Sequence, residues 1–581
     1  MSEKRLNKRE RHKASLSPFE YYPQIEALDF NAISEGDSFY LQDFGIFNNP
    51  LADEEYTLRL RITAGRISTA QLIAIAEIVK SHALEIILTA RSGIQLHGLS
   101  SENVLSVYKQ INALGISTWQ TFGDNVRNIV TDVYDGQGRF SVIETYPLIM
   151  QMEKYFLKTP HLVGMLPRRL STGISGTSAN VSSFFANDLY FALAKKEDRF
   201  GFNVYMGGKN TEVARSADIF LPPEAVVSFF SAFVETFNKH GSRFTRSRTR
   251  LFYLLGDIGL DTFKEHIAQV YQTSWESEGT LVLQKREFSQ YERLNNGSYA
   301  FCYETDFGRI TPEELLNIAA FVDACGGEVR LSTDHNLYLI GLPEPTVPFG
   351  SLKESETVVA CAGSHYCPYS FWNIKDEAAL LPLKAIKKHR IQVGISGCAK
   401  GCSRHQHCDI GLIGLRTGNF GEADKGVRIY IGAEHTHGTG VGRELFEMVP
   451  LEHLSAVLEL IIREYEMSGY ENFELFSMHR LNRYTIEFLS LWFLAQLDTG
   501  STLSLSDVTL PQCSVEEEVF NGEKELFEEC FMHEPFLSLI EDDFKDAIRY
   551  MSKKVWVVST TESAIAPQIK RLLTATKYWE R

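Results

Sequence analysis

Residues 65–96 carry a helix-like pattern of apolar positions followed by a strand-like one. Four apolar side chains recur at helical spacing, namely Leu72, Ile75, Ala76 and Val79. Ser68 precedes them and is a residue type that accepts hydrogen bonds from the first backbone N–H groups of a helix. The stretch 85-EIILTA-90 then has the apolar, β-branched composition of a strand. The pattern predicts a helix that begins after Ser68 and a strand that follows it.

The same pattern returns in residues 308–339. The two stretches align without a gap, and their residue numbers differ by 243 throughout (308 minus 65). In the second copy Thr311 takes the place of Ser68, and Pro312 suits the first helical turn. Identical residues fall into register along both elements: Gly65/Gly308, Arg66/Arg309, Ile67/Ile310, Leu72/Leu315, Ile75/Ile318, Ala76/Ala319, Val79/Val322, Glu85/Glu328, Leu88/Leu331 and Leu96/Leu339. One constant offset through a helix and a strand indicates an internal duplication.

A second, weaker echo links 201-GFNVYMGG-208 with 426-GVRIYIGA-433. Both are alternating strand patterns that end in a glycine-containing turn. We therefore predict an α+β protein that is built from two related halves around a pseudo-twofold axis. A cleft between such halves is a natural place for a large ligand.

Composition adds limits to this picture. A chain of 581 residues is expected to form several domains, because single cores stop growing near ~250–300 residues. No apolar run reaches the ~18 residues needed to span a bilayer, and the charged N-terminus lacks the apolar core of a signal peptide. We therefore expect no membrane association and a cytoplasmic location. The net charge of −16 argues against nucleic-acid binding.

The nine cysteines are an odd number in a large chain without an export signal, so a disulfide framework is not expected. Four of them form two pairs: Cys361 and Cys367 have five residues between them, and Cys398 and Cys402 have three. Thirty residues separate the pairs, and both lie in glycine-containing segments. Four thiolates from two such loops suit a cubane iron-sulfur cluster.

Other chemistries remain open at this point. Structural zinc sites usually have two or three residues between paired ligands, so spacings of five and three residues together fit poorly. A thioredoxin-like pair needs C-x-x-C, which these cysteines lack. Four unconnected buried thiols are a further possibility. Cys408 falls outside the paired pattern and is expected to be a core residue.

With GLIG after the second cysteine pair, the pattern resembles the siroheme and 4Fe-4S nitrite/sulfite reductase family. The resemblance extends over about residues 40–490. Its other blocks are 58-LRLRITAGRIS-68, 87-ILTARSGIQLHG-98, 122-FGDNVRNIV-130, 166-LPRR-169 and 201-GFNVYMGG-208.

The resemblance implies an internally duplicated three-domain fold with pseudo-twofold symmetry. After an N-terminal arm (1–50), a ferredoxin-like half-domain (51–120) is expected to pair with its repeat (300–345). The region 121–299 is expected to form a siroheme- and substrate-binding α/β domain. Residues 346–499 would form the domain that binds the cluster and the siroheme. Residues 500–581 form a C-terminal extension that the resemblance does not cover, and we assign it no role.

The resemblance also implies a function and a set of site residues. Cys361, Cys367, Cys398 and Cys402 would hold the cluster, and Cys402 would also bridge to the siroheme iron. Substrate-facing cations map to Arg61, Arg127 and Arg169. The expected activity is an assimilatory oxidoreductase reaction, the six-electron reduction of sulfite to sulfide or of nitrite to ammonia. Positions that line the siroheme map to Arg91, Gln95, Arg168 and Asn336.

Several residues depart from the family pattern. Ala399-Lys400 stands where Pro-Asn is usual, and Asp334-His335 where Asn-Gln is frequent. Ser171 matches neither the lysine of sulfite reductases nor the asparagine of nitrite reductases, and Gly123 matches neither branch. The doubled arginine 59-RLR-61 and the pair His97-Gly98 resemble the sulfite branch. We therefore favour sulfite, with nitrite as the alternative.

The electron donor is expected to be a separate protein, because no glycine-rich dinucleotide loop is present. Similar single-chain enzymes take electrons from ferredoxin, a small acidic protein. The candidate docking segments are basic: 243-RFTRSRTR-250, 384-KAIKKHR-390 and the N-terminal arm. The departures at residues 123, 171 and 399–400 also motivate an alternative of another class, a non-catalytic protein that binds siroheme or the cluster.

Overall fold

The computed structural model describes residues 6–49, 55–286, 289–349, 357–416 and 425–484, with positions 486, 489–490, 492–493 and 496. The expected C-terminal extension, from residue 500 onward, lies outside the described residues. The chain divides into two compact units, Met1–Glu356 with Thr436–Gly438, and Thr357–His435 with Thr439–Arg581. Within the described ranges, every helix is too short or too polar to cross a membrane.

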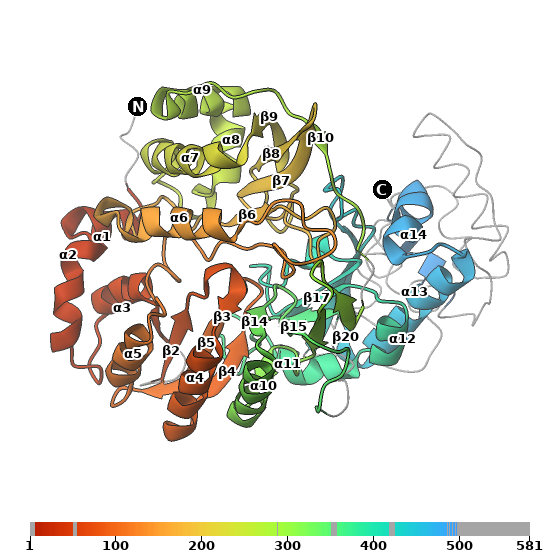
Figure 1. The fold of residues 1–581 in the computed structure, drawn as a ribbon, viewed down its shortest axis with the longest axis horizontal. Coiled ribbons are helices and arrows are strands. Elements are labelled where there is room, and N and C mark those ends of the chain that lie inside the picture. The colour runs from red at the N-terminus through yellow and green to blue at the C-terminus, as the bar shows by residue number, and fades with distance from the viewer. Residues whose placement is uncertain are drawn as a thin grey trace, which may run out of the picture. The chain divides into compact units, whose positions relative to one another are not determined.

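Two five-stranded sheets of the first unit contain the duplicated segments (Figure 1). One has the order β1 (Ile46–Asn48), β2 (Glu55–Leu60), β5 (Ile94–Ser100), β4 (Glu85–Leu88), β13 (Arg309–Ile310). The other has the order β11 (Tyr291–Arg293), β12 (Tyr299–Tyr303), β15 (Leu337–Leu342), β14 (Glu328–Leu331), β3 (Arg66–Ile67). The two orders are equivalent element by element, which confirms the predicted duplication.

The two copies exchange one short strand. β3 comes from the first repeat but pairs with β14 of the second, and β13 comes from the second but pairs with β4 of the first. The registers are also equivalent: Arg66 lies opposite Arg330, and Arg309 lies opposite Ile87, which is position 330 minus 243. Each sheet is therefore completed by the other repeat.

The predicted helices are α4 (Thr69–Ser81) and α10 (Pro312–Cys325), which pack against each other (Figure 1). Ser68 and Gln71 form a capping box at the start of α4, and Thr311 and Glu314 form the same arrangement at α10. The predicted apolar stripes are fully buried, in α4 as in α10. Together with both sheets they form one hydrophobic core.

A third sheet in the first unit consists of β6 (Thr172–Ser175), β7 (Leu189–Lys196), β8 (Arg199–Met206), β9 (Arg215–Leu221) and β10 (Thr280–Leu281). β6 is parallel to β7, and β8 and β9 continue antiparallel. Its helices are α6 (Tyr146–Leu157), α7 (Val226–His240), α8 (Leu251–Ile258) and α9 (Leu260–Tyr271). Their apolar faces share a second core with β6 to β9.

The second unit repeats this topology. Its sheet has the order β16 (Val358–Ala360), β17 (Val393–Ser396), β18 (Ile410–Arg416), β19 (Lys425–Ile431), β20 (Arg443–Pro450). β17 is parallel to β18, while β19 and β20 continue antiparallel, as in β6 to β9. β19 therefore corresponds to β8, the pair that the weaker echo predicted. The helices are α11 (Ile374–Glu377), α12 (Leu383–Lys388), α13 (Leu454–Ser468) and α14 (Phe473–His479).

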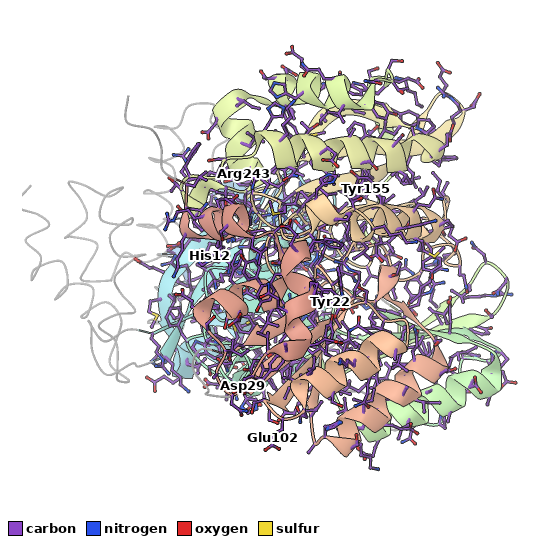
Figure 2. All side chains as sticks on the ribbon, turned by 90° about the vertical axis from the view of Figure 1, so that its left-hand side faces the viewer. His12, Tyr22, Asp29, Glu102, Tyr155 and Arg243 are labelled. Carbon is purple, nitrogen blue, oxygen red and sulfur yellow. The ribbon has the colours of Figure 1, made fainter. Side chains whose placement is uncertain are left out.

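The remaining helices of the first unit are α1 (Lys8–Ser15), α2 (Pro18–Tyr21), α3 (Glu35–Leu41) and α5 (Val104–Ala113). α1, with His12, lies beside the segment that carries Arg243 (Figure 2). Asn7, the N-cap of α1, donates from its backbone and its side chain to Arg243 O, at 3.1 and 2.8 Å. The N-terminal arm is thus folded onto the unit.

Candidate active site

Arginines from four separate segments converge in the first unit. Arg59 is on β2, Arg91 lies in the β4–β5 turn, and Arg127 and Arg169 lie in the segments that lead to β6. Burial lowers the pKa of Arg127 well below its usual range, and the charges of the other three arginines act in the same direction. An anion placed among these side chains would favour their charged forms. The arrangement is therefore suited to binding a small oxyanion.

Arg59 is a member of this group that the sequence did not assign. Its guanidinium lies over the ring of Phe122, 3.8 Å from the centroid, and donates to Thr121 O at 3.3 Å. Gln95 lies opposite Arg59 in the sheet register. With the Gln95 amide turned so that Oε1 accepts, Arg59 donates to it at 2.7 and 3.2 Å. The signal available in the sequence was the spacing 59-RLR-61, which offers two arginines on one face of a strand.

Arg61 has a different environment. It follows the last residue of β2 and is only 3% exposed. Its guanidinium contacts Glu153 of α6 at 3.5 Å and donates to Val126 O at 2.9 Å and Gln120 O at 3.2 Å. Burial lowers the pKa of Arg61, while the Glu153 carboxylate opposes this shift. Arg61 is therefore paired in the interior of the unit.

Arg91 and Asn336 occupy equivalent hairpin turns in the two repeats. Arg91 donates to Asn128 O at 2.8 and 3.1 Å and to Asn187 Oδ1 at 3.1 Å. Asn336 is buried, and its Oδ1 accepts from the Thr305 backbone N–H at 3.1 Å. Both turns also have a residue with positive φ, Ser92 at 51° and His335 at 72°. The two predicted siroheme positions thus lie at the same edge of each repeat.

Ser171 is tied to a buried carboxylate. Its backbone N–H and hydroxyl donate to Asp188 Oδ2 at 2.9 and 2.5 Å, and the hydroxyl accepts from the Asp188 N–H at 3.0 Å. Arg250 donates to the other oxygen of Asp188 at 2.8 and 3.2 Å. The position where sulfite reductases have a lysine therefore has a hydroxyl with a carboxylate next to it.

The space beside Gly123 is filled by another carboxyl group. Gly123 has φ +63°, and a Cβ at this position would overlap Asp43 Oδ1. Asp43 is 2% exposed and accepts from Asn125 Nδ2 at 2.6 Å. Burial and the neighbouring charge of Asp124 raise the pKa of Asp43 to about 7. Gly123, which matched neither branch, is thus required by both its backbone conformation and this contact.

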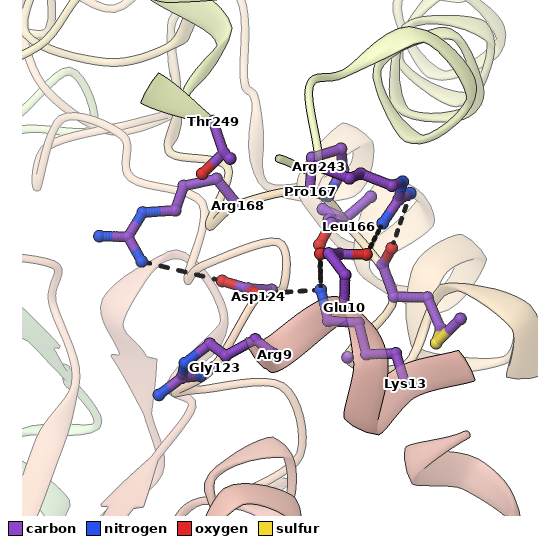
Figure 3. Close-up of polar contacts among 12 residues, drawn as sticks. Arg9, Glu10, Lys13, Gly123, Asp124, Leu166, Pro167, Arg168, Arg243 and Thr249 are labelled. Atoms are coloured by element: carbon purple, nitrogen blue, oxygen red, sulfur yellow. Dashed lines mark hydrogen bonds and ion pairs between the residues drawn. The ribbon is translucent and has the colours of Figure 1, made fainter. Parts of the chain in front are cut away.

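Asp124 lies at the centre of an ion-pair network (Figure 3). Arg246 donates to its two oxygens at 2.6 and 2.8 Å, Lys13 of α1 contacts it at 3.0 Å, and Arg168 lies 4.0 Å away. Burial lowers the pKa of Arg168 to about 10, and the charge of Arg246 contributes, whereas Asp124 opposes the shift. The predicted site residue Arg168 is therefore held at the edge of this network.

Three arginines of the basic segment 243–250 form ion pairs within the first unit. Arg243 contacts Glu10 at 2.6 Å, while Arg246 and Arg250 pair with Asp124 and Asp188. Arg248 is the exposed arginine of the segment, and it pairs with Asp257 at 3.3 Å. The segment is thus mainly structural, which leaves less of it for docking a partner.

The four paired cysteines lie at the carboxyl ends of two parallel strands in the second unit. Cys361 follows β16 and extends its pairing, because its N–H donates to Ile395 O of β17 at 2.9 Å. Cys398 comes two residues after the end of β17. Because adjacent parallel strands end at the same edge, the loops 361–373 and 397–404 meet there. The parallel pairing of β16 and β17 explains why cysteines so far apart in the chain come together.

The thiols also interact electrostatically. Burial raises the pKa of Cys361, Cys367 and Cys398, and the charge of Cys402 raises each further. Backbone N–H groups act in the opposite direction at all three sulfurs. Gly397 donates to Cys361 Sγ at 3.0 Å, and Tyr369 and Lys400 bond to Cys367 and Cys398. Because these thiols oppose one another's ionisation and three of them also accept N–H bonds, the arrangement fits a cluster whose iron would neutralise the thiolates.

The described residues do not include a typical site for a single metal ion. No three His, Cys, Asp or Glu side chains in the described ranges are placed to hold one ion. Each iron of a cubane takes one cysteine, so its four ligands stand farther apart than the ligands of one zinc ion. The zinc alternative is therefore not supported in this part of the chain.

Two glycines and Lys400 shape these loops. A Cβ on Gly397 would overlap Ser370 Oγ, and Gly363 has φ +78°. Lys400 Nζ lies over the ring of Tyr369, 2.8 Å from the centroid, and so connects the two cysteine loops. This contact is a feature of the Ala399-Lys400 sequence that departs from the family pattern. Cys408 is buried beneath the second loop, with Sγ 3.6 Å from Arg404 O.

Comparison with known proteins assigns both units. Residues 122–274 and 387–479 match the nitrite and sulphite reductase 4Fe-4S domain, and residues 49–114 and 292–348 match the nitrite/sulfite reductase ferredoxin-like half domain. The NirA protein of Mycobacterium tuberculosis has the same fold, with a TM-score of 0.75 at 21% identity over 82% of this chain and 96% of that one.

Two sequence relatives bear different names. The ferredoxin–nitrite reductase of Synechococcus elongatus is 27% identical over 494 residues, which cover 79% of this chain and 96% of that protein. Sulfite reductase (ferredoxin) 2 of Mycolicibacterium paratuberculosis is 25% identical over 441 residues, which cover 71% and 79%. The segments matched by the two family models include Cys398, Cys402, Arg59, Arg91, Arg127 and Arg169. The chain belongs to the nitrite and sulfite reductase family and is an oxidoreductase whose cofactors are siroheme and a 4Fe-4S cluster.

Proposed function

We propose that the protein catalyses the ferredoxin-dependent, six-electron reduction of sulfite to sulfide. The observation that carries this proposal is the convergence of Arg59, Arg91, Arg127 and Arg169. Near neutral pH a substantial fraction of sulfite is the dianion, so several fixed cations are needed to hold it in place of water. These arginines repel one another, so a bound anion relieves the repulsion. A dianion therefore gains more electrostatic binding energy here than a monoanion would.

Each part of the chain has a distinct task in this proposal. Cys361, Cys367, Cys398 and Cys402 would hold the cluster, and Cys402 would also be the residue shared with the siroheme. Once bound, the two cofactors supply electrons one at a time to the anion. Arg127 and Arg169 orient the oxyanion and keep hydrogen-bond donors directed at its oxygens, and Arg59 joins them. The residues that would contact the siroheme periphery, where cations and amides would offset its carboxylates, are Arg91, Gln95, Arg168 and Asn336.

Arg61 was expected to face the substrate, but we now propose an indirect role for it. Its guanidinium is occupied by Glu153 and by backbone carbonyls. We therefore propose that Arg61 supports the β2 end that presents Arg59. The domain limits drawn from the sequence also remain our proposal; the matched segments 122–274 and 387–479 fall inside two of the proposed domains.

Nitrite reduction to ammonia is the second candidate. It is favoured by Ser171, whose hydroxyl is bound to the Asp188 carboxylate at 2.5 Å. This position therefore supplies no cation, which suits a monoanion better than a dianion. The name of the Synechococcus elongatus relative also points this way.

Ferredoxin is the proposed electron donor. Both named relatives carry ferredoxin in their names, and the exposed segment 384–390 offers basic residues in the unit that holds the cysteines. We propose a cytoplasmic location, because none of the seven described cysteines forms a disulfide, as in a reducing compartment.

The experiment that separates the substrates is a comparison of kcat/KM for sulfite and nitrite, with reduced ferredoxin as donor. The proposal expects a ratio above one in favour of sulfite. A ratio below one assigns the enzyme to nitrite instead. The visible spectrum of the purified protein tests the non-catalytic alternative, since a protein with siroheme absorption but no turnover of either anion would support that alternative.

A further inference from the structure

We propose that α1 is a positioning element of the oxyanion site: Lys13 fixes Asp124, and Asp124 in turn fixes Arg127 and Arg168. This inference rests on the proposed function, because it concerns the residues to which that function assigns the anion and the siroheme. It adds a part of the chain that lies outside the family matches. Those matches begin at residue 49, whereas α1 ends at Ser15.

Lys13 uses all three of its N–H donors inside the protein. Nζ donates to Glu10 Oε1 at 2.8 Å, to Asp124 Oδ2 at 3.0 Å and to Leu166 O at 2.7 Å. The Lys13 side chain is 2% exposed. A lysine that is buried and fully bonded is a fixed charge, unlike the flexible lysines of a protein surface. It therefore joins α1 to two segments, 124 and 166, that flank the arginines.

Asp124 is the carboxylate on which the surrounding cations meet. It is 1% exposed and accepts from Arg246 through both oxygens, in addition to Lys13. Burial alone would raise the pKa of Asp124, but the charges of Lys13 and Arg246 hold it well below its usual range. Asp124 is therefore ionised and can hold Arg168, 4.0 Å away, by charge.

The backbone next to Asp124 supports Arg127. The Arg127 guanidinium donates to Thr121 O and to Gly123 O, the latter at 3.0 Å. Asp124 O accepts from the Leu166 N–H at 3.2 Å, which ties this loop to the LPRR segment. A shift of Asp124 would therefore displace the two carbonyl groups that hold Arg127. The charge of Asp124 also opposes the lowered pKa of Arg127.

α1 itself is anchored at a second point. Glu10, one turn before Lys13, accepts from Arg243 at 2.6 Å, and Arg243 also donates to Met165 O at 3.1 Å. Figure 3 shows Glu10, Lys13 and Arg243 grouped on one side of Asp124, with Arg168 on the other. The network thus connects the N-terminal helix to the LPRR segment from two directions.

The test uses the full-length enzyme with its cofactors and replaces Lys13 by methionine. Lys13→Met keeps an unbranched apolar stem but removes the charge and its three hydrogen bonds. We expect a KM for sulfite or nitrite that is about tenfold higher, with siroheme absorption per chain retained. Lys8→Met is the matched control, because Lys8 lies on the same helix but pairs with the exposed Glu35. Its KM should stay within about twofold of the natural enzyme.

Two further variants separate charge from packing. Lys13→Gln keeps hydrogen-bonding capacity but no charge, and we expect its KM to rise in the same direction. Lys13→Arg restores the charge and should recover most of the natural KM. If Lys13→Met and Lys13→Gln fold and lower Tm but leave KM unchanged, Lys13 is merely structural and the inference is wrong.

Hydrogen exchange provides a readout that does not depend on the substrate. Lys13→Gln should accelerate amide exchange in peptides that cover residues 121–127, while Lys8→Met should not. Unchanged exchange in that loop contradicts the inference even in a protein that reduces neither anion. A natural enzyme without activity toward sulfite or nitrite would instead overturn only the proposed function.

Discussion

Asp43 is a carboxyl group with little to stabilise its charge. It is buried next to Asp124, with Asn125 as a hydrogen-bond donor and Lys13 and Arg9 as favourable charges. Burial and Asp124 outweigh these groups, so the pKa of Asp43 is raised to about 7. The folded protein therefore keeps this group protonated at a pH where the unfolded chain has lost the proton.

The pH dependence of Asp43→Asn follows from this shift. Between about pH 4 and 7 the folded state binds more protons than the unfolded state, so Asp43 makes the natural protein less stable as pH rises. Asparagine does not titrate and keeps an oxygen acceptor for Asn125. We expect the Tm of Asp43→Asn, relative to that of the natural protein, to increase from pH 4 to pH 7. The effect is at most on the order of 1.4 kcal/mol per pH unit.

Asp198→Asn is a suitable control for this experiment, because Asp198 is exposed in the turn between β7 and β8. Its Tm difference should not vary with pH over the same range. A Tm difference for Asp43→Asn that is equally flat would show that Asp43 is ionised in the folded protein at pH 4.

At the residue scale, the sequence predicted ligand types better than it predicted side-chain environments. The spacing of the cysteines was sufficient to propose the cluster, because loops that hold four thiols need little else. The sequence could not show which of Arg59 and Arg61 joins the group of arginines. The answer depends on where β2 ends and on Glu153, which is 92 positions after Arg61. The requirement for glycine at 123 also depended on Asp43, a residue from another segment.

At the element scale, a proposed cluster ligand and a core thiol lie close together in the chain but have different environments. Cys402 is exposed and interacts electrostatically with the other three thiols of the pairs, whereas Cys408 is buried against Arg404 O. The two residues are only six positions apart. They therefore form a matched pair for mutation within the connection between β17 and β18.

Cys402→Ser is expected to abolish reduction of both anions and to lower iron and acid-labile sulfide per chain, because the cluster loses a ligand. Cys408→Ser replaces a packed thiol by a smaller group and should retain iron, sulfide and turnover, with a small loss of Tm. Metal analysis and single-turnover rates measure both. Near-normal activity of Cys402→Ser would remove this residue from the proposed ligand set.

The elements of the duplication were predictable because each copy carries a capping residue, an apolar stripe and a strand at one offset. The exchange of β3 and β13 was not. Each of these strands is only two residues long. The strand with which it pairs depends on how the two repeats pack together and not on its own sequence. The parallel pairing of β16 with β17, which brings the cysteine loops together, was also outside the reach of local patterns.

At the scale of the whole molecule, the net charge is negative, but the segment where we propose that the donor docks is positively charged. The chain carries −16, yet Lys384, Lys388 and Arg390 are exposed in one short segment. An acidic partner would be repelled by most of the surface and attracted to this segment. Electrostatic steering of this type depends strongly on ionic strength.

Lys384→Glu is therefore expected to raise the KM for ferredoxin severalfold at low salt, with the difference shrinking as salt increases. Activity driven by a small neutral or cationic dye should not change, because the dye does not need the segment. Arg248→Glu is the control, since Arg248 is the exposed arginine of the largely internal 243–250 segment. A ferredoxin KM that is insensitive to both Lys384→Glu and salt contradicts docking at 384–390.

The exchanged strands also govern the order in which the chain can fold during synthesis. When β4 leaves the ribosome, its outer edge has no partner until residues 309–310 have been made. β3 likewise waits for β14, which lies more than 250 residues later. An unpaired strand edge is a template for association with other chains. The first half of this protein is thus exposed to misassembly until the second repeat has been made, and chaperone binding to that half would protect it during this interval.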